Sequence, residues 1–386
     1  MTTYDFDQIF DRRGTDSIKW RTYPPDVLPL YAADMDFPSP PAIAEALHTR
    51  INHGFFGYPA EPFELRELLV ERLARLYGWK IAPEAIVFVP RIAEGVIDAC
   101  RAVADAGADI VLPTPIYCFV RVLTDAGFNC LHVPMIPRAD GQLTFDFDRL
   151  EAAGDDKTRL LFLCNPHNPI GRVYTEAELR RLAELCQRRR LVIVSDEVYS
   201  DLVFSGHRHI PIAALDEDIA ARTFTVMGPG KSFNIAGLRC AWIIAQDAGL
   251  RDRLQKVVTG QSSEVGVLGW VAALAAYRGG QEWLEQVLRY LEGNRDFVYD
   301  YVRRYLPGVE MAKPEGTYVA WLDCRQAGIV GNPSEFFLRE ARVAVNDGVL
   351  FGASGESCVR LVFGSPRKML QEGLERMRVA LEKSRR

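Results

Sequence analysis

Residues 191–199 read LVIVSDEVY, an apolar run that ends in an acidic pair, with Tyr199 three residues after Asp196. Six more short apolar runs alternate with amphipathic helical patterns: IVFV at 86–89, DIVLP at 109–113, CLHVP at 130–134, LLFLC at 160–164, TFTVM at 223–227 and CAWIIA at 240–245. This alternation predicts an α/β fold whose seven-stranded, mainly parallel sheet is covered by helices. Ligands of such sheets bind beyond the carboxyl ends of the strands, so the residues directly after the runs are the first site candidates.

The pattern changes at both ends of the chain. The first residues form an arm rich in Asp, Arg and Pro, and a long helical stretch runs from about Glu282 to Tyr305. After it, TYVAWLD, VAV and CVRLVF are separated by helical patterns, which is typical of an α+β lobe. We therefore expect an N-terminal arm over 1–45 that joins the small domain, a large domain over 46–281 and a small α+β domain over 282–386.

Composition narrows the class of protein. The 386 residues are 48% hydrophobic and 25% charged, which excludes a disordered chain and a fibre. A net charge of -5 offers no basic surface for nucleic acid. Eight scattered cysteines without a C-x-x-C pair are typical of reduced core residues, and neither a signal peptide nor a membrane span is apparent. We expect a cytoplasmic protein without nucleic-acid or membrane partners.

Three segments that follow strand patterns carry candidate chemistry. NPHNPIG at 165–171 contains Asn168, DEVY contains Asp196, and GPGKSFNIAGLR at 228–239 contains Lys231. Burial at a strand end lowers the pKa of a lysine and makes it a usable nucleophile and base. Each segment also has a plain structural interpretation: a rigid turn, a helix cap and a surface lysine on a glycine-rich turn. Only their occurrence together, in this order, favours a catalytic site.

The ordered set resembles the class I and II aminotransferase family, fold type I enzymes that use pyridoxal 5'-phosphate (PLP). The features that match are N-P-x-N-P-x-G, D-x-x-Y, K-x-F-N-x-x-G-L-R and Arg360 in CVRLVFGSPR. Within that family the chain is most similar to the cystathionine β-lyase group, the C–S lyases related to the maltose-regulon repressor. That likeness is carried by DRRGTDSIKW at 11–20, AADMDF at 32–37, HGFFGY at 53–58, TPIY at 114–117, SDLVFSGHRHIP at 200–211 and RLVFGSPR at 360–367.

The resemblance implies roles around the cofactor ring. Lys231 would form the Schiff base with PLP and then remove the α-proton of the substrate. Asp196 would keep the pyridine nitrogen protonated, so that the ring withdraws electrons. Tyr199 and Asn168 would form hydrogen bonds with the 3'-oxygen of the ring, and Tyr117 would stack on the ring face. A tyrosine at the end of a strand can also be an ordinary core residue.

The resemblance also implies how the phosphate is held. Arg239 would contribute a positive charge. The backbone amides of Ile92 and Ala93, at the start of a helix, would donate hydrogen bonds to the phosphate. Tyr58 matches a residue that reaches the phosphate from the other subunit. This assignment requires a homodimer whose active sites lie at the subunit interface.

The substrate is expected to be an amino acid. Arg360 would bind its α-carboxylate as a bidentate fork, because an arginine that interrupts an apolar strand is costly unless it serves such a purpose. The resemblance places Ala33 and Tyr58 at the substrate as well. It assigns no metal ligand.

Several positions depart from the pattern of the group. The usual Ser-x-Ser-Lys is Gly-Pro-Gly-Lys here, so two hydroxyl groups are missing before Lys231. Val362 and Tyr199 stand where the lyase group usually has Asn and His, and Arg91 stands where a small residue is usual. These departures concern the substrate more than the cofactor.

Three functions remain open at this stage. A β-lyase would expel a thiolate from the β-carbon of cystathionine or another cysteine S-conjugate and release pyruvate and ammonia. An aminotransferase, or a specialised PLP enzyme acting on an unusual amino acid, would use the same Lys231, Asp196 and Arg360. A non-catalytic regulator that binds a partner protein is the third. Global resemblance favours the lyase.

Overall fold

The computed structural model describes residues 3–117, 119–260 and 264–385. Its main sheet has seven strands in the order β2-β10-β9-β8-β7-β3-β4. Each predicted run forms one of them: β2 (Ile86–Val89), β3 (Asp109–Thr114), β4 (Asn129–Pro134), β7 (Leu160–Cys164), β8 (Val192–Asp196), β9 (Thr223–Met227) and β10 (Ala241–Ile244). Only β10 runs antiparallel to its two neighbours in this sheet. The predicted mainly parallel sheet is confirmed.

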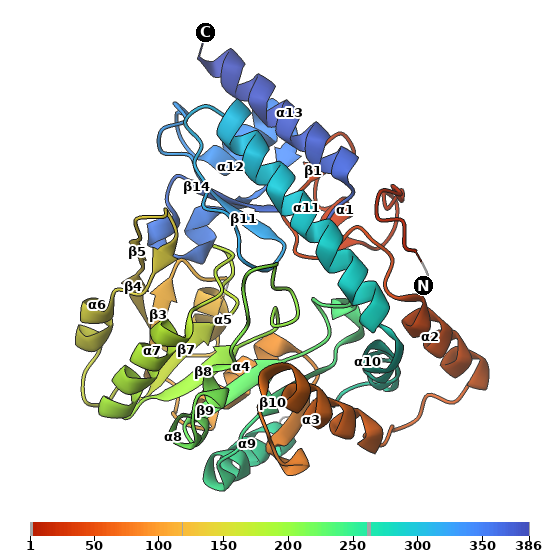
Figure 1. Cartoon of the computed structure of the whole chain (residues 1–386), viewed down its shortest axis with the longest axis vertical. Coiled ribbons are helices and arrows are strands. Elements are labelled where there is room, and N and C mark those ends of the chain that lie inside the picture. Colours follow the sequence, from red (N-terminus) through yellow and green to blue (C-terminus); the bar gives the residue numbers. More distant parts are fainter. Residues whose placement is uncertain (1–2, 118, 261–263, 386) are drawn as a thin grey trace.

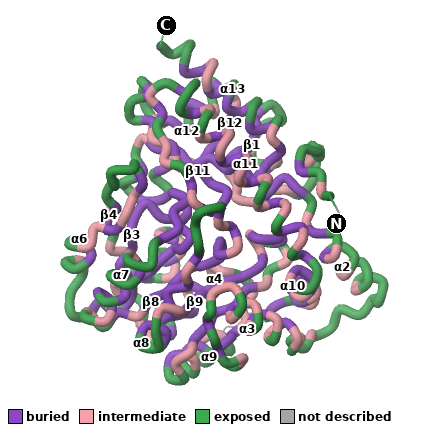
Figure 2. The backbone as a smooth tube through the Cα atoms, viewed as in Figure 1, coloured by how far each residue is buried: buried purple, intermediate pink, exposed green. Residues whose placement is uncertain are grey.

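The sheet is buried on both faces, which explains why its strands are continuously apolar. All five residues of β7 are buried. Leu160, Phe162 and Cys164 belong to the hydrophobic cluster on one face, while Leu161 and Leu163 belong to the cluster on the other. This alternation follows from the two-residue period of a strand. Figure 2 shows the buried residues concentrated at the sheet and the exposed ones on outer helices and loops.

Helices cover both faces of the sheet (Figure 1). The cluster on one face includes residues of α4 (Ile92–Arg101), α5 (Phe119–Asp125) and α9 (Ala248–Gly260), and the cluster on the other includes residues of α6 (Phe147–Ala152) and α7 (Glu176–Arg188). Beside the sheet, α10 (Val267–Gly279) packs on α2 (Pro41–His53) and α3 (Phe63–Tyr77). A capping box of Thr175 and Glu178 fixes the start of α7.

A second sheet lies above the first in Figure 1. Its antiparallel order is β11-β14-β13, with β11 at Val319–Asp323, β14 at Cys358–Val362 and β13 at Asn346–Asp347. The long α11 (Gln281–Tyr305) and the terminal α13 (Arg367–Ser384) pack together beside it. In the arm, β1 (Leu28–Pro29) pairs in parallel with β12 (Val343–Ala344). The exact division of the chain at residues 45 and 281 stays a prediction.

Two further observations concern the environment of the chain. Among the described residues, no helix is long and apolar enough to cross a membrane. The seven described cysteines are all free thiols, and five of them are buried.

Candidate active site

A cavity of about 320 Å³ opens at the carboxyl ends of the central strands. Its walls come from the segments that directly follow β2, β3, β7, β8 and β9, where the site was expected. Eight of the predicted site residues line it: Ile92, Ala93, Tyr117, Asn168, Asp196, Tyr199, Lys231 and Arg239. The fold therefore brings together residues up to 147 positions apart in the sequence.

Asp196 is the last residue of β8 and is buried at the floor of this cavity. Its Oδ1 accepts a hydrogen bond of 3.1 Å from the amide of Val198. Burial raises the pKa of Asp196 to about 7, and the charge of Glu197 acts in the same direction, while Val198 and Lys231 oppose the rise. A carboxyl group in this position would be stabilised in its charged form by a cationic partner inside the cavity.

Lys231 lies in the turn after β9, and its Nζ donates a 2.6 Å hydrogen bond to the backbone carbonyl of Ala33. The hydroxyl of Tyr318 donates to the same carbonyl at 2.8 Å. The arm therefore reaches the predicted nucleophile. Ala33 lies beside Lys231 although it is not among the residues that line the cavity.

Packing explains the two glycines that stand where the group has serines. A Cβ at Gly228 would lie 3.1 Å from the carbonyl oxygen of Cys240, and one at Gly230 would lie 3.2 Å from the Cα of Ala236. Both contacts are tighter than side chains normally show. The close approach of backbone to backbone thus favours glycine, and hydroxyl groups are absent from this part of the wall.

Arg360 is buried in the middle of β14 and adjoins the cavity. Its guanidinium donates to the side-chain oxygens of Asn168 at 3.1 Å and Asn346 at 2.6 Å, and to the carbonyl of Tyr31 at 2.7 Å. The guanidinium carbon lies 5.4 Å from the ring centre of Tyr117. Asn168 and Tyr117 both line the cavity, so a carboxylate bound there would lie within reach of Arg360.

The opposite end of the cavity offers groups that suit an anion. Helix α4 begins at Ile92, and the amide of Gly95 donates the first hydrogen bond of the helix, to the carbonyl of Arg91. The amides before Gly95 are therefore available to a ligand. Arg239 is exposed and has a left-handed backbone conformation with φ of 54°. Arg91 also lines this end and forms an ion pair with Glu94.

Tyr58 does not reach the cavity within a single chain. It is fully exposed, in a segment between α2 and α3 that also exposes Phe55 and Phe56. The green tube between these two helices in Figure 2 shows the exposure of this connection. Its predicted role requires a second subunit.

The structure adds residues that the sequence pattern did not identify. Tyr318 holds the carbonyl of Ala33, while Asn346 and the carbonyl of Tyr31 hold Arg360. Tyr318 lies within the run TYVAWLD and Asn346 directly follows VAV, but nothing in their spacing linked them to Lys231 or Arg360. Apolar side chains complete the cavity wall: Phe119, Val122, Val198 and Ile235.

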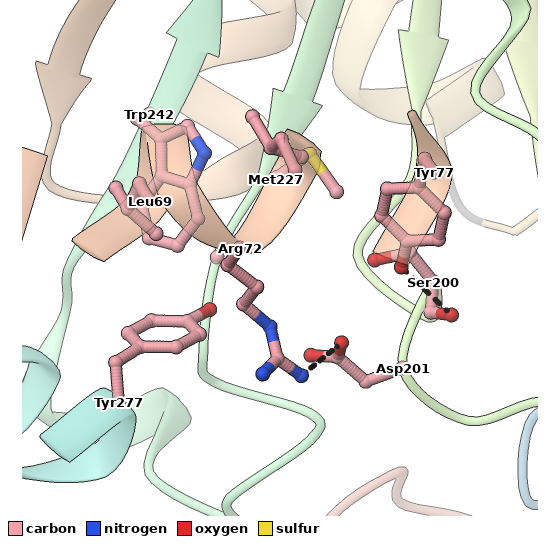
Figure 3. A pocket seen from close by; sticks show the side chains of 10 residues that line it. Leu69, Arg72, Tyr77, Ser200, Asp201, Met227, Trp242 and Tyr277 are labelled. Carbon is pink, nitrogen blue, oxygen red and sulfur yellow. Dashed lines mark hydrogen bonds and ion pairs between the residues drawn. The ribbon is translucent and has the colours of Figure 1, made fainter. Parts of the chain in front are cut away.

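Figure 3 shows a second, much smaller cavity, and Gly228 is among the residues that line it. It is lined by a partly buried ion pair of 2.7 Å between Arg72 and Asp201, with the ring of Tyr277 beside Arg72. Its volume of about 10 Å³ holds at most about one water molecule. This cavity is therefore too small for a substrate.

Residues 25–377 match the class I and II aminotransferase family, and the chain belongs to that family. It is 36% identical to the cystathionine β-lyase PatB of Bacillus subtilis, with 98% of this chain and 100% of that protein covered. The crystal structure of OvoB superimposes with a TM-score of 0.93 at 40% identity, over 98% of this chain and 99% of OvoB. Cystalysin from Treponema denticola, whose crystal structure contains PLP, gives a TM-score of 0.94 at 28% identity over 99% and 100% of the two chains.

Proposed function

We propose that this protein is a PLP-dependent carbon–sulfur β-lyase that eliminates a thiol from an S-substituted cysteine and yields pyruvate and ammonia. Full-length similarity to a cystathionine β-lyase supports the reaction class. The observation that carries the proposal is that Lys231 and Asp196 line one cavity, which Arg360 adjoins through Asn168. An amine nucleophile, a buried acid and a carboxylate-binding guanidinium are the groups that this chemistry requires.

The residues of the cavity fit PLP. Asp196 would pair with the protonated ring nitrogen, which would replace the solvation that burial takes from its carboxylate. Arg239 and the amides of Ile92 and Ala93 would hold the phosphate. Tyr199, which lines the cavity as Asn168 does, would form a hydrogen bond with the 3'-oxygen of the ring. Burial raises the pKa of Tyr199, so its hydroxyl keeps its proton and remains a hydrogen-bond donor. Bound PLP supplies an electron sink for the pair left on the α-carbon.

The protein groups then act on the amino acid in a defined order. Arg360 binds the α-carboxylate and thereby fixes the α-carbon relative to Lys231. The Nζ of Lys231 removes the α-proton as a general base. The Cβ–S bond then breaks, its electron pair leaves on sulfur as a thiolate, and hydrolysis of the remaining fragment gives pyruvate and ammonia.

Transamination is the second candidate function, because Tyr199 stands where the lyase group usually has histidine.

Product analysis separates the two reactions. Purified holoenzyme is incubated with cystathionine and a panel of cysteine S-conjugates, with and without a keto-acid acceptor. Pyruvate and ammonia formed without an acceptor support elimination. Turnover that depends on the acceptor would establish transamination, and the absence of any turnover and of cofactor absorbance would favour the non-catalytic regulator.

We further propose a homodimer in which Tyr58 enters the partner's site. Support comes from the exposed aromatic residues Phe55, Phe56, Tyr58 and Phe63, since apolar patches on a surface commonly mark an interface. A cytoplasmic location is consistent with the seven free cysteines. Sedimentation equilibrium of the holoenzyme tests the dimer, and a monomer that retains full activity would refute the shared site.

A further inference from the structure

One backbone segment of the arm, residues 31–37, contacts both the amine of Lys231 and the guanidinium of Arg360. The carbonyl of Tyr31 accepts from Arg360 at 2.7 Å, and the carbonyl of Ala33 accepts from Nζ of Lys231 at 2.6 Å. Arg360 comes from the second sheet and Lys231 from the first. Two carbonyls on one short segment therefore help to set the distance between the group that binds the carboxylate and the group that moves the α-proton.

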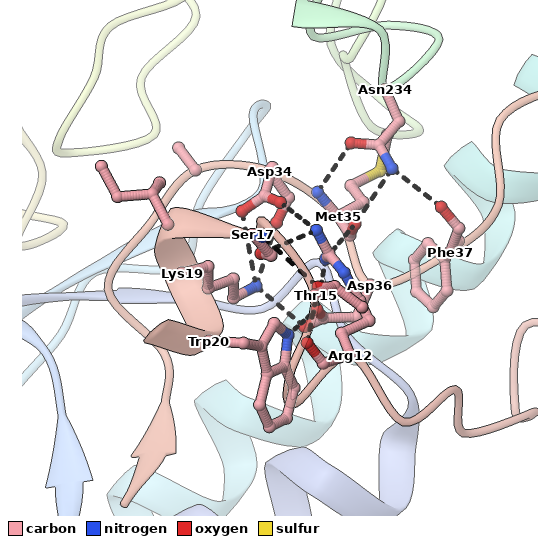
Figure 4. A network of polar contacts seen from close by, with 12 residues as sticks. Arg12, Thr15, Ser17, Lys19, Trp20, Asp34, Met35, Asp36, Phe37 and Asn234 are labelled. Atoms are coloured by element: carbon pink, nitrogen blue, oxygen red, sulfur yellow. Dashed lines mark hydrogen bonds and ion pairs between the residues drawn. The ribbon is translucent and has the colours of Figure 1, made fainter. Parts of the chain in front are cut away.

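Asp36 anchors this segment through four side-chain donors, and Figure 4 labels three of them, Arg12, Lys19 and Trp20. The Nζ of Lys19 donates to Oδ2 at 2.8 Å and Ser365 donates to the same oxygen at 2.7 Å. Arg12 and Trp20 donate to Oδ1 at 2.8 and 2.9 Å. The donors come from the start of the arm and from the residues after β14, so Asp36 ties three parts of the chain together.

Lys19 contributes a second contact to the segment and is itself inaccessible to solvent. Its Nζ also donates to the carbonyl of Asp34 at 3.0 Å, directly after Ala33. The side chains of Lys19 and Asp36 are 0% and 4% exposed. Burial opposes the ionisation of Asp36, but the charge and hydrogen bond of Lys19 hold the pKa of Asp36 below its usual value, and the hydrogen bonds of Ser365 and Trp20 act in the same direction.

A buried ion pair of this kind is not explained by stability alone. Removing two charges from water costs several kcal/mol, and apolar residues of similar size often stabilise a fold as well or better. What the pair adds is a fixed geometry, since Asp36 accepts hydrogen bonds from four side chains. Asn234, three residues after Lys231, adds to this geometry through hydrogen bonds to the backbone of Met35 and Phe37.

We propose that Lys19 and Asp36 are positioning residues for the reaction, which hold residues 31–37 so that the carbonyl of Ala33 orients the amine of Lys231. This inference rests on the proposed function of Lys231 as the base. A neutral amine has two N–H donors and one lone pair. When one N–H is directed at the carbonyl of Ala33, the directions open to the lone pair are restricted, and proton transfer depends on that alignment.

The test uses Lys19→Met, which removes the charge and keeps much of the side-chain volume. Ser365→Ala, which removes a single bond to Asp36, is the milder second variant. Arg295→Met is the matched control, because Arg295 is also buried and ion-paired, to Glu292 and Asp296, but within the described part of the chain it has no hydrogen bond or ion pair to residues 31–37.

Two measurements report on the amine of Lys231. The first is the rate at which the apoprotein captures PLP, measured by absorbance. The second is exchange of the substrate α-proton in deuterated buffer by the holoenzyme. A misplacement of about 1 Å can cost about 100-fold in rate, so Lys19→Met should lower exchange about 10- to 100-fold and slow capture. Ser365→Ala should lower exchange by a smaller factor than Lys19→Met, because three of the four donors to Asp36 remain in place. Arg295→Met should lower the melting temperature and leave both rates unchanged.

The outcomes separate this inference from the proposed function. Unchanged capture and exchange in both Lys19→Met and Ser365→Ala would overturn the positioning role, whatever the product of the enzyme. A wild-type enzyme that exchanges α-protons but makes no pyruvate would contradict only the lyase assignment. If Arg295→Met lowered capture and exchange as much as Lys19→Met does, the effect would be general destabilisation, and the positioning role would also be overturned.

Discussion

The buried carboxyl of Asp196 should make the apoprotein less stable as the pH rises. Because its pKa in the folded chain is about 7, the folded state retains a proton between about pH 4 and pH 7 that the unfolded state has released. The free energy of unfolding therefore falls with rising pH over this interval. Each pKa unit corresponds to about 1.4 kcal/mol, so the rise from 3.8 to about 7 corresponds to a loss of about 4 kcal/mol.

Asp196→Asn removes this titration while it keeps the shape of the side chain. Urea denaturation of both apoproteins at several pH values should give similar stabilities near about pH 4 and a more stable Asp196→Asn protein above about pH 7, by up to about 4 kcal/mol. Saturating PLP should remove the wild-type loss, because a protonated ring nitrogen would pair with the carboxylate. A stability difference between the two apoproteins that does not change with pH would refute the reasoning.

Three further predictions concern single side chains. Borohydride reduction of the holoenzyme should attach the cofactor to Lys231, as mapped by mass spectrometry, and an adduct on another lysine would exclude the assignment. Arg360→Ala should lower kcat/KM for amino acids by about 100-fold or more but spare amines that lack the carboxylate, because a charged hydrogen bond is worth roughly 1.5–3 kcal/mol; an equal loss for both would contradict the fork. Tyr58→Ala should raise the Kd for PLP, measured by fluorescence, but not for pyridoxal without its phosphate. Equal changes for the two ligands would remove Tyr58 from the phosphate.

The sheet was predictable because its strands are buried on both faces. A strand such as β7, with all five residues buried, must be continuously apolar, and this pattern is visible in the sequence. The order of the strands, and the reversal of β10 between β2 and β9, could not be derived from the runs, because they depend on how the connections cross the sheet.

The cavity residues were predictable where they follow a strand. Asp196 and Lys231 stand at strand ends, and parallel strands bring their carboxyl ends to one edge of the sheet. The partners of these residues come from elsewhere. The carbonyls of Ala33 and Tyr31 lie in an arm about 200 or more residues away, and a backbone carbonyl carries no signature in the side-chain sequence.

The sequence by itself determined the types of chemical group and the edge of the sheet at which they gather, because burial and strand period leave a direct pattern in the order of residues. The tertiary structure alone decided which partner each group meets. Ser365 reaches Asp36 only when the arm packs against the residues after β14, and Arg360 meets Asn168 only when the second sheet lies over the first. Such contacts depend on distances in space, and spacing along the chain does not encode them.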